Sequence, residues 1–181
     1  MSHAGWGYSG LAMASDSFRI GHGYDLHRLE PVAPDGAGRP FVLAGVPFDH
    51  PCGPVGHSDG DALLHAVTDA ILGALGDPDI GQLFADTDPA HDGADSAVFL
   101  RHAVARMRQT GYHLANLDAT VVCERPKLGP SKDAMLDNLA SILGCERARV
   151  NLKGKTHEQV DAIGEGRAIE VHAVVLLTRG K

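Results

Sequence analysis

Two short segments of this chain combine imidazoles and carboxylates at spacings that suit one divalent metal ion. Asp25 and His27 are two positions apart, so in a strand both side chains leave the same face. Asp61 and His65 are four positions apart, which is about one helical turn. Zinc sites that perform chemistry usually take three nitrogen or oxygen ligands from the protein and leave one position open. Asp25, His27 and His65 would form an open site of this kind.

Each of these segments also has a simpler interpretation when it is taken alone. Asp25 and His27 fit a strand that turns two polar side chains to water, and residues 57–61 fit a polar turn that leads into a helix. A helix cap does not account for His65, whereas a shared metal ion does. Asp61 fits either a helix cap or a carboxylate that orients a ligand imidazole, because metal-bound histidines usually donate their second ring proton to a nearby acceptor.

Two later segments suit phosphate groups. Residues 153–158 end a predicted strand with two lysines, a threonine hydroxyl and a glutamate, which suits a phosphate together with a second, hard metal ion such as magnesium held by Glu158. Residues 124–128 end another strand at a proline, and Lys127 there is either a surface charge or a phosphate contact. A solvated strand end is the simpler interpretation of either segment alone.

The composition is typical of a water-soluble globular domain. With 181 residues, of which 44% are hydrophobic and 22% charged, the chain is long enough to bury one core. Its net charge of -7 disfavours nucleic acid as a partner, because phosphate backbones are bound mainly by clustered Lys and Arg. Three widely spaced cysteines without a C-x-x-C pair indicate neither disulfides nor a thiolate zinc site. No apolar run approaches roughly 18 residues and no signal sequence is recognisable, so we expect no membrane partner and a cytoplasmic location.

Apolar periodicity and turn residues predict an α+β fold, in which one domain, 18–181, follows a flexible N-terminal tail, 1–17. We expect a mixed sheet that helices cover on one face, and the strands over 18–27 and 41–46 could pair in it. The predicted strands are 18–27, 41–46, 117–122, 150–153 and 169–178, and the predicted helices are 64–75, 96–111 and 130–143.

Three details of these elements bear on the site. Ser58 followed by Asp61 is typical of a helix N-terminus, with Ser58 as the cap. Asp95 and Ser96 are candidate caps of the next helix. Residues 76–95 are dense in Asp, Gly and Pro and predict a long loop, which in a compact domain is often functional.

Taken together, these motifs resemble the 2-C-methyl-D-erythritol 2,4-cyclodiphosphate synthases, enzymes of the non-mevalonate isoprenoid pathway. The resemblance covers about residues 19–178. Its most specific parts are residues 19–27, 56–61 with 65–70, and 79–81 with 83–89. Residues 125–127 and 155–158 are weaker matches, but they follow in the expected order.

The resemblance implies a phosphorus–oxygen lyase. In this family the 2-phosphate of 4-diphosphocytidyl-2-C-methyl-D-erythritol 2-phosphate attacks the β-phosphorus of the cytidine diphosphate arm, which closes 2-C-methyl-D-erythritol 2,4-cyclodiphosphate and releases CMP. Such a site must hold two anionic groups in line although they repel each other. The resemblance also implies a homotrimer with its active sites between neighbouring subunits.

The family's functional residues map onto this chain position by position. Zinc, or another divalent metal, would be bound by Asp25, His27 and His65, and magnesium or manganese bridging the substrate diphosphate by Glu158. His57 and Thr156 match catalytic hydrogen-bond donors to phosphate oxygens. Asp61 would lie behind the metal ligands and orient one of their imidazoles. The positions that match substrate contacts are Asp25, Leu26, His27, His57, Ser58, Asp79, Ile80, Gly81, Phe84, Asp86, Thr87, Asp88, Lys127, Leu128, Lys155, Thr156, His157 and Glu158.

Residues 162–168 depart from the family's pattern. Where the family commonly has an aromatic residue and then Gly-Arg-Gly-Glu-Gly, this chain has Ala162 and later Gly-Glu-Gly-Arg-Ala, so the acid and the base are exchanged. Because an ion pair that bridges subunits keeps its attraction after such an exchange, we expect Glu165 and Arg167 still to form a contact near the trimer axis. The exchange puts in doubt the binding of a phosphate or isoprenoid diphosphate along that axis. Lys155, where threonine is common, adds a charge to the nucleotide pocket.

Two other functions fit parts of the same pattern. A zinc-dependent phosphohydrolase would use the open metal position to activate water and would release inorganic phosphate. A noncatalytic trimeric binder of nucleotide or isoprenoid diphosphate would keep the metal site without the reaction. The presence of His57, Thr156 and Glu158 argues against a binder, since binding alone has less need of a complete reacting centre.

Overall fold

Burial alternates along the first long strand, β1 (Phe18–Pro31), which has one side against the helices and the other facing outward. The computed structural model describes residues 17–84 and 93–179. The predicted tail therefore lies outside the described residues except for Ser17, and so do residues 85–92 of the predicted loop. Among the helices of the described residues, none is both long and apolar enough to cross a membrane.

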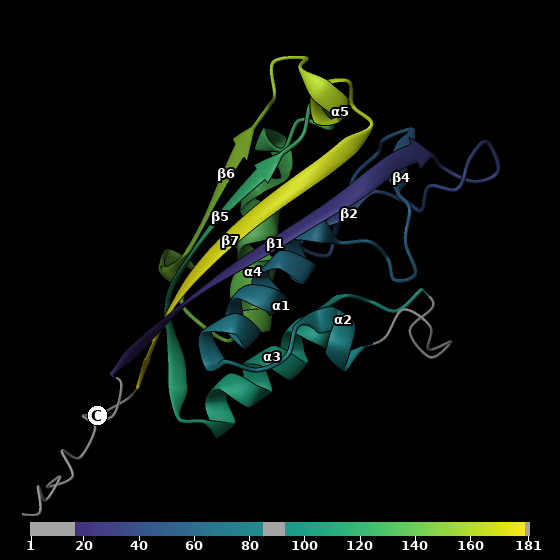
Figure 1. Cartoon of the computed structure of the whole chain (residues 1–181). Helices are drawn as coiled ribbons and strands as arrows, with labels where there is room; N and C mark the ends of the chain where they lie inside the picture. Colours follow the sequence, from purple (N-terminus) through teal and green to yellow (C-terminus); the bar gives the residue numbers. More distant parts are fainter. Residues whose placement is uncertain (1–16, 85–92, 180–181) are drawn as a thin grey trace, which may run out of the picture.

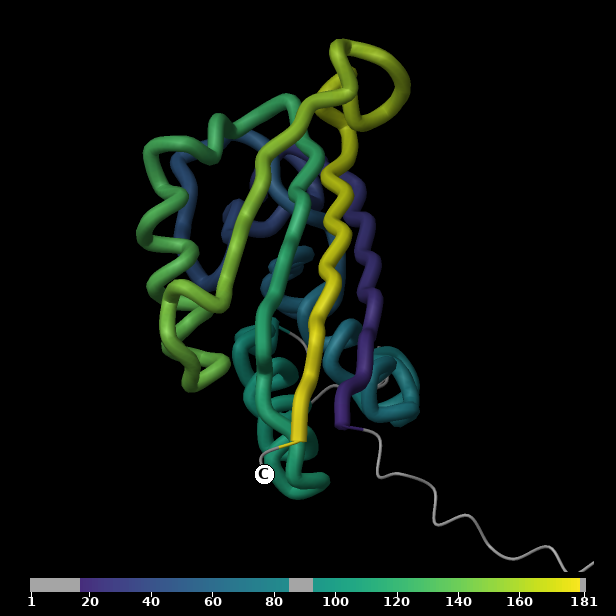
Figure 2. Tube along the Cα trace, turned by 90° about the vertical axis from the view of Figure 1, so that its left-hand side faces the viewer, coloured from purple at the N-terminus to yellow at the C-terminus, as the bar shows by residue number. Residues whose placement is uncertain are grey.

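The long strands form one five-stranded sheet. Its members besides β1 are β4 (Cys52–Pro54), β5 (Tyr112–Val122), β6 (Val150–Lys155) and β7 (Ala168–Arg179). Their order across the sheet is β4-β1-β7-β5-β6, and all neighbours are antiparallel except β5 and β6. Figure 2 shows the traces of β5, β7 and β1 running side by side. The expected α+β fold with a mixed sheet is confirmed.

Three longer helices pack on the inner side of this sheet and against one another. They are α1 (Ala62–Leu75), α3 (Ala97–Gln109) and α4 (Lys132–Leu143), and they lie close to their predicted ranges. Shorter pieces are α2 (Ile80–Leu83), α5 (Asp161–Gly164) and two 3-10 turns at Gly129–Ser131 and Arg147–Arg149. Figure 1 shows α1 beside β1, and this pair makes the most extensive contact between a helix and a strand of the sheet.

The prediction of one strand over 41–46 was wrong. This run is a small hairpin of β2 (Val42–Leu43) and β3 (Val46–Pro47), separate from the main sheet. Ala44 and Gly45 have φ angles of 52° and 70°, so the chain reverses between them. The neighbour of β1 on this side is β4 instead, which pairs with its last residues.

The cap predicted for the first helix was also wrong in its residue. Asp61 is the N-cap of α1, and its Oδ1 accepts a hydrogen bond of 3.0 Å from the Leu64 amide. The Ser58 hydroxyl lies one turn earlier and accepts from the Gly60 amide instead. The reason is geometric, because the helix begins only at Ala62 and the backbone at Gly60, with a φ of 74°, is left-handed.

Two glycines of β1 let α1 lie directly on the sheet. A Cβ at Gly21 would lie 1.8 Å from the carbonyl oxygen of Ala70, and one at Gly23 would lie 1.8 Å from that of Ala66. Any larger residue would therefore push the helix away from the strand. This close approach fixes the early part of α1, which carries His65, beside the segment of β1 that carries Asp25.

Candidate active site in two parts

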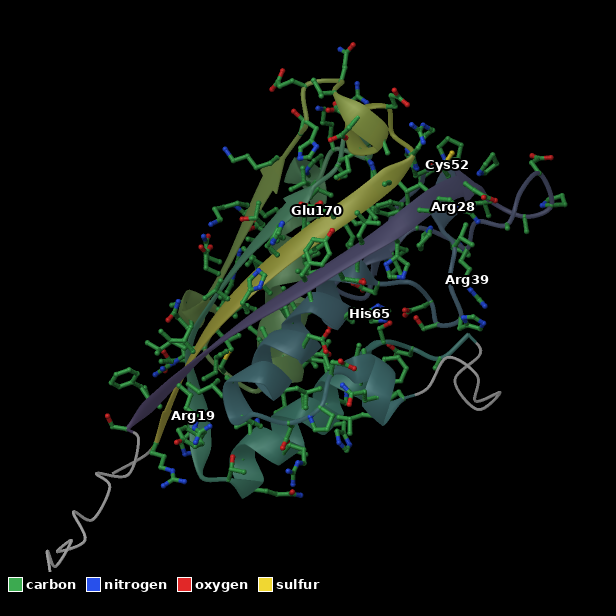
Figure 3. All side chains as sticks on the ribbon, in the orientation of Figure 1. Arg19, Arg28, Arg39, Cys52, His65 and Glu170 are labelled. Atoms are coloured by element: carbon green, nitrogen blue, oxygen red, sulfur yellow. The ribbon has the colours of Figure 1, made fainter. Side chains whose placement is uncertain are left out.

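Asp25, His27 and His65 lie together, with one potential ligand atom from each within 4.8 Å of the others. Oδ2 of Asp25 is 2.9 Å from Nδ1 of His27 and 3.2 Å from Nδ1 of His65. Asp25 and His27 leave the inner side of β1, as the two-residue spacing predicts, and His65 comes from the first turn of α1. Figure 3 shows His65 beside this strand.

The donor set fits a divalent ion. The Nδ1 atom of His27 is buried and forms no hydrogen bond with any described residue, although it points toward the Asp25 carboxylate. The His65 Nδ1 points to the same oxygen. Two imidazole nitrogens and one carboxylate oxygen that converge on one point are the ligands of an open zinc-type site. This cluster can therefore hold a metal ion.

Electrostatics within the cluster favour a charged carboxylate. Burial opposes ionisation of Asp25, but the imidazoles of His27 and His65 outweigh it and lower the pKa of Asp25 to about 2. Burial likewise works against a protonated His65, yet the hydrogen bond and charge of Asp25 raise the pKa of that imidazole above its usual value. A metal ion binding here therefore competes with a proton for His65.

Asp61 has a structural task. Its fully buried carboxyl group accepts hydrogen bonds from the amides of Leu64, Ala44 and Gly45, which ties the α1 cap to the β2–β3 turn. Burial raises the pKa of Asp61 to about 6 despite these donors. Of the two roles expected for this residue, the structure displays the cap, and among the described residues its side chain has no hydrogen bond to an imidazole.

Sequence reasoning missed the groups that do contact the second nitrogen of His65. Nε2 lies 2.8 Å from the Ser96 hydroxyl and 3.2 Å from that of Ser58. Ser96 in turn donates to the Asp59 carboxylate. Ser96 looked like a helix cap, but it forms no cap hydrogen bond to α3, and Asp95 accepts from the Ala97 amide instead. Only the presence of Asp59 in the motif around His57 could have suggested this contact.

A cavity of about 510 Å³ opens beside the cluster. Of the expected substrate contacts, it is lined by Asp25, Leu26, His27, His57, Ser58, Ile80, Gly81 and Phe84. Asp79 lies next to it as the cap of α2, where its side chain accepts from the backbone and side chain of Gln82. Asp86, Thr87 and Asp88 lie outside the described residues.

The backbone around His57 is held from two sides. The Arg39 guanidinium donates to the carbonyl oxygens of Gly56 and His57 at 2.8 and 3.1 Å. The His57 carbonyl also accepts from the Gly93 amide at 2.6 Å. The imidazole of His57 itself is exposed at the cavity wall. Arg39 was not singled out from the sequence, because nothing in its local pattern connects it to a segment 17 positions later.

A second cavity, of about 550 Å³, lies where β5 and β6 end. Lys127, Leu128, Lys155, Thr156 and Glu158 line it, together with Cys123, whose thiol pKa is raised to about 11 by burial. The hydroxyl of Thr156 donates to the Glu158 carboxylate at 3.3 Å. The imidazole of His157, the remaining expected contact, lies 2.9 Å from Asp161 instead.

The loop after β6 is unusual in its backbone. Glu158, Gln159 and Asp161 all have φ angles between 51° and 64°, a region that residues with a side chain seldom occupy. The Glu124 carboxylate supports this loop by accepting from the amides of His157 and Gln159. Such strain is often found where a side chain must be held for function.

A family model described as the YgbB family matches residues 18–178. The chain belongs to this family. Its relatives include the chloroplastic 2-C-methyl-D-erythritol 2,4-cyclodiphosphate synthase of Catharanthus roseus, 56% identical over 163 residues, which cover 90% of this chain and 66% of that protein. The synthase of the same name from Azoarcus sp. (strain BH72) is 48% identical over 162 residues, which cover 90% of this chain and 96% of that protein.

Solved structures agree with this assignment to the YgbB family. IspF of Plasmodium falciparum, solved as a CDP complex, has a TM-score of 0.78 at 34% identity, over 91% of this chain and 98% of that chain. The bifunctional IspDF of Campylobacter jejuni has a TM-score of 0.83 at 38% identity, over 91% of this chain and 43% of that chain. The family expected from the motifs is confirmed.

In this YgbB-family chain, the expected site residues form two groups rather than one. The first group is the cluster of Asp25, His27 and His65, called the metal cluster below, together with His57, and it lies on the side of β1 and α1. The second group, Lys127, Thr156 and Glu158, follows β5 and β6. In the sheet, strand β7 separates β1 from β5. Within the described part of one protomer, the two groups therefore line separate cavities.

The exchanged pair of the YgbB-family chain is in contact within the protomer. Nε of Arg167 donates to the Glu165 carboxylate at 2.7 Å. The expected contact near a trimer axis stays a prediction. Both side chains are more than half exposed, so this ion pair adds little to stability by itself.

Proposed function

We propose that this chain converts 4-diphosphocytidyl-2-C-methyl-D-erythritol 2-phosphate into 2-C-methyl-D-erythritol 2,4-cyclodiphosphate and CMP. The observation that carries the proposal is the convergence of Asp25, His27 and His65 beside a cavity that His57 also lines. The names and the 48 to 56% identities of its relatives support the same phosphorus–oxygen lyase activity. The second cavity, which Lys127, Lys132 and Lys155 line, supports a ligand that carries phosphates.

In this reaction an oxygen of the 2-phosphate forms a bond to the β-phosphorus, and the bond from that phosphorus to the α-phosphate oxygen breaks. The electron pair leaves with CMP, and no water is consumed. His57 and Thr156 donate hydrogen bonds to phosphate oxygens, and Lys127 and Lys155 offset their charge. Asp25, His27 and His65 would hold zinc, and Glu158 would hold magnesium or manganese. When bound, these ions would supply positive charge at the diphosphate.

The ligand of the second cavity is the cytidine diphosphate arm. Two solved relatives are CDP complexes, namely IspF of Plasmodium falciparum and a 2-C-methyl-D-erythritol 2,4-cyclodiphosphate synthase in a CDP-bound form. In this chain, Leu128 and Pro126 offer apolar surface for a base, and Lys127 and Lys155 offer charge for phosphates. Asp79, Ile80 and Gly81 contact the ribose, and Phe84 contacts the methylerythritol part.

The active form is a homotrimer with its sites between neighbouring subunits. The outward side of the sheet presents exposed apolar side chains, among them Ile20 at 66%, Leu26 at 48% and Val174 at 43% exposure. Such a surface is typical of a protein interface. In such a trimer, the Lys127 and Glu158 group of one subunit would complete the site at the Asp25, His27 and His65 cluster of its neighbour. This arrangement is supported by the two separate cavities of one protomer.

We propose a single domain over residues 18–181, which the family match over 18–178 supports. The cytoplasmic location stays a prediction, since the plant relatives are named chloroplastic.

Phosphorus NMR of the purified protein with its proposed substrate, zinc and magnesium tests the function. We expect a cyclic diphosphate and CMP in equal amounts. Inorganic phosphate without the cyclic product would instead identify a zinc-dependent phosphohydrolase. Unchanged substrate in a protein that holds zinc and binds CDP would identify a noncatalytic binder.

A further inference from the structure

A fully buried serine hydroxyl lies directly behind the metal cluster. Ser96 is 0% exposed, and its Oγ is 2.8 Å from Nε2 of His65. The same hydroxyl contacts Oδ1 of Asp59. Burying a hydroxyl is unfavourable unless it is hydrogen-bonded, so these two contacts account for its presence in the interior.

The hydrogen bonds in this chain of contacts are donated in one direction, from His65 to Ser96 and from Ser96 to Asp59. Nδ1 of His65 faces Oδ2 of Asp25, so a metal ion in the cluster would take the lone pair of Nδ1. The ring proton then resides on Nε2 and is donated to the Ser96 oxygen. The hydroxyl proton of Ser96 is left for Asp59, which as a carboxylate only accepts.

Asp59 is itself held in place by the backbone. Its Oδ2 accepts from the Ser96 amide at 3.2 Å, and its Oδ1 accepts from the Asp61 amide at 3.1 Å. The Asp59 amide donates to the Ala94 carbonyl at 3.0 Å. These bonds join the segment that precedes α1 to the segment that precedes α3, so neither Asp59 nor Ser96 is free to swing away from the imidazole.

The Ser58 hydroxyl is a weaker second partner of the same imidazole. It lies 3.2 Å from Nε2 and already accepts from the Gly60 amide at 3.1 Å. Among the described residues it has no carboxylate partner to receive its own proton. The shorter contact that ends on a carboxylate is therefore the one that sets the ring.

We propose that Ser96 and Asp59 are positioning residues that fix the tautomer and orientation of His65 as a metal ligand. This inference rests on the proposed function only in taking the Asp25, His27 and His65 cluster as a metal site. Partners of this kind fix the ring and raise its basicity, and their loss typically lowers metal affinity by about 10-fold to 100-fold. The proposal also explains why Ser96 forms no cap bond to α3.

The test is zinc affinity, measured for the folded protein by competition with a chromophoric chelator. We expect Ser96→Ala to weaken zinc binding about 10-fold to 100-fold. Thr68→Val is the matched control. Thr68 carries another fully buried hydroxyl near His65 on α1, but its hydrogen-bond partner among the described residues is the Leu64 carbonyl. This variant should bind zinc like the parent protein, even if it is less stable.

Asp59→Asn, which keeps the Ser96 hydroxyl, is the second variant, and it decides the question if Ser96→Ala does not fold. We expect weaker zinc binding here also. Both oxygens of Asp59 accept hydrogen bonds, so the NH₂ group of an asparagine would face another donor, either the Ser96 hydroxyl or a backbone amide. Unchanged zinc affinity in the folded Ser96→Ala protein, or in Asp59→Asn when the first variant is unfolded, overturns the proposal.

The result is separable from the proposed function. A parent protein that binds no zinc, and does not differ from Asp25→Asn in this assay, would overturn both the metal assignment and this inference. A parent protein that binds zinc but forms no cyclic product would remove the proposed reaction, while the comparison of Ser96→Ala with Thr68→Val would still decide the role of Ser96.

Discussion

Nδ1 of His65 lies 3.2 Å from Oδ2 of Asp25, although 40 positions separate the two residues. The contact exists because Gly21 and Gly23 let α1 rest on the backbone of β1. The geometry of the metal cluster thus depends on two residues that carry no functional group. This dependence can be tested directly.

Gly23→Ala should separate the cluster. Its Cβ would lie 1.8 Å from the Ala66 carbonyl oxygen, so we expect a loss of about 3 kcal/mol in the free energy of unfolding and weaker zinc binding. Gly73→Ala is the control, since its Cβ would be 3.8 Å from the nearest atom, the His22 carbonyl oxygen. Inside a helix this change should stabilise by about 0.5–1 kcal/mol. Urea unfolding checks both, and equal stability of the two variants would contradict the packing argument.

Removal of the metal ligand should remove the activity. Asp25→Asn keeps the size of the side chain but loses the charge that the imidazoles hold in place, so we expect little bound zinc and no measurable cyclisation. Dialysis of the parent protein against a chelator should have the same effect, reversed by added zinc. Full turnover by an Asp25→Asn protein with normal metal content would refute the assignment.

Asp61 should make stability depend on pH in a direction opposite to that of most carboxylates. Because its pKa is raised from 3.8 to about 6, the folded chain holds this proton more tightly than the unfolded chain. The resulting stabilisation is present below about pH 3.8 and is lost as the pH rises to about 6, which amounts to roughly 3 kcal/mol.

Asp61→Asn has no proton to lose in this range. The difference in unfolding free energy between the parent protein and Asp61→Asn should therefore shrink by roughly 2.5 kcal/mol between pH 4 and pH 7. Urea titrations of both proteins at each pH measure it. A difference that stays constant would show that Asp61 is ionised throughout.

Arg39→Met should impair turnover more than metal binding. It removes the two hydrogen bonds that hold the carbonyls of Gly56 and His57, so His57 is less well placed, and kcat should fall about 10-fold to 100-fold. Zinc affinity should not change. Arg147→Met removes an arginine that pairs with Asp133 and Asp137 at the surface, and it should leave kcat as it is. An unaltered kcat in Arg39→Met would exclude this positioning role.

Val174→Asp should break the proposed trimer. The side chain is 43% exposed on the outward side of the sheet, and a buried, unpaired charge at an interface is strongly unfavourable. Light scattering after size-exclusion chromatography should report the mass of one chain, with little activity. Val98 lies on α3 and is 52% exposed, and Val98→Asp should leave the assembly intact. A trimeric Val174→Asp protein would place the interface elsewhere.

Local patterns in the sequence were enough to predict much of the fold and the metal cluster. The alternation of β1 puts Asp25 and His27 on one side, and helical periodicity after Asp61 puts His65 at the start of a helix. These features depend on residues within a few positions of one another, so propensity and side-chain period determine them. The turn at Ala44 and Gly45 was missed because a short apolar run does not reveal where it reverses.

The remaining features depend on contacts between distant parts of the chain. His65 reaches Ser96 across 31 positions and Arg39 reaches the His57 carbonyl across 18, and neither pair has a local signature. The sequence by itself determined that Asp25 and His27 share one side of a strand and that His65 lies at the start of a helix. Only the tertiary structure decided which second partner holds His65 and that Glu158 lies apart from the metal cluster, because helix packing and strand order set these distances.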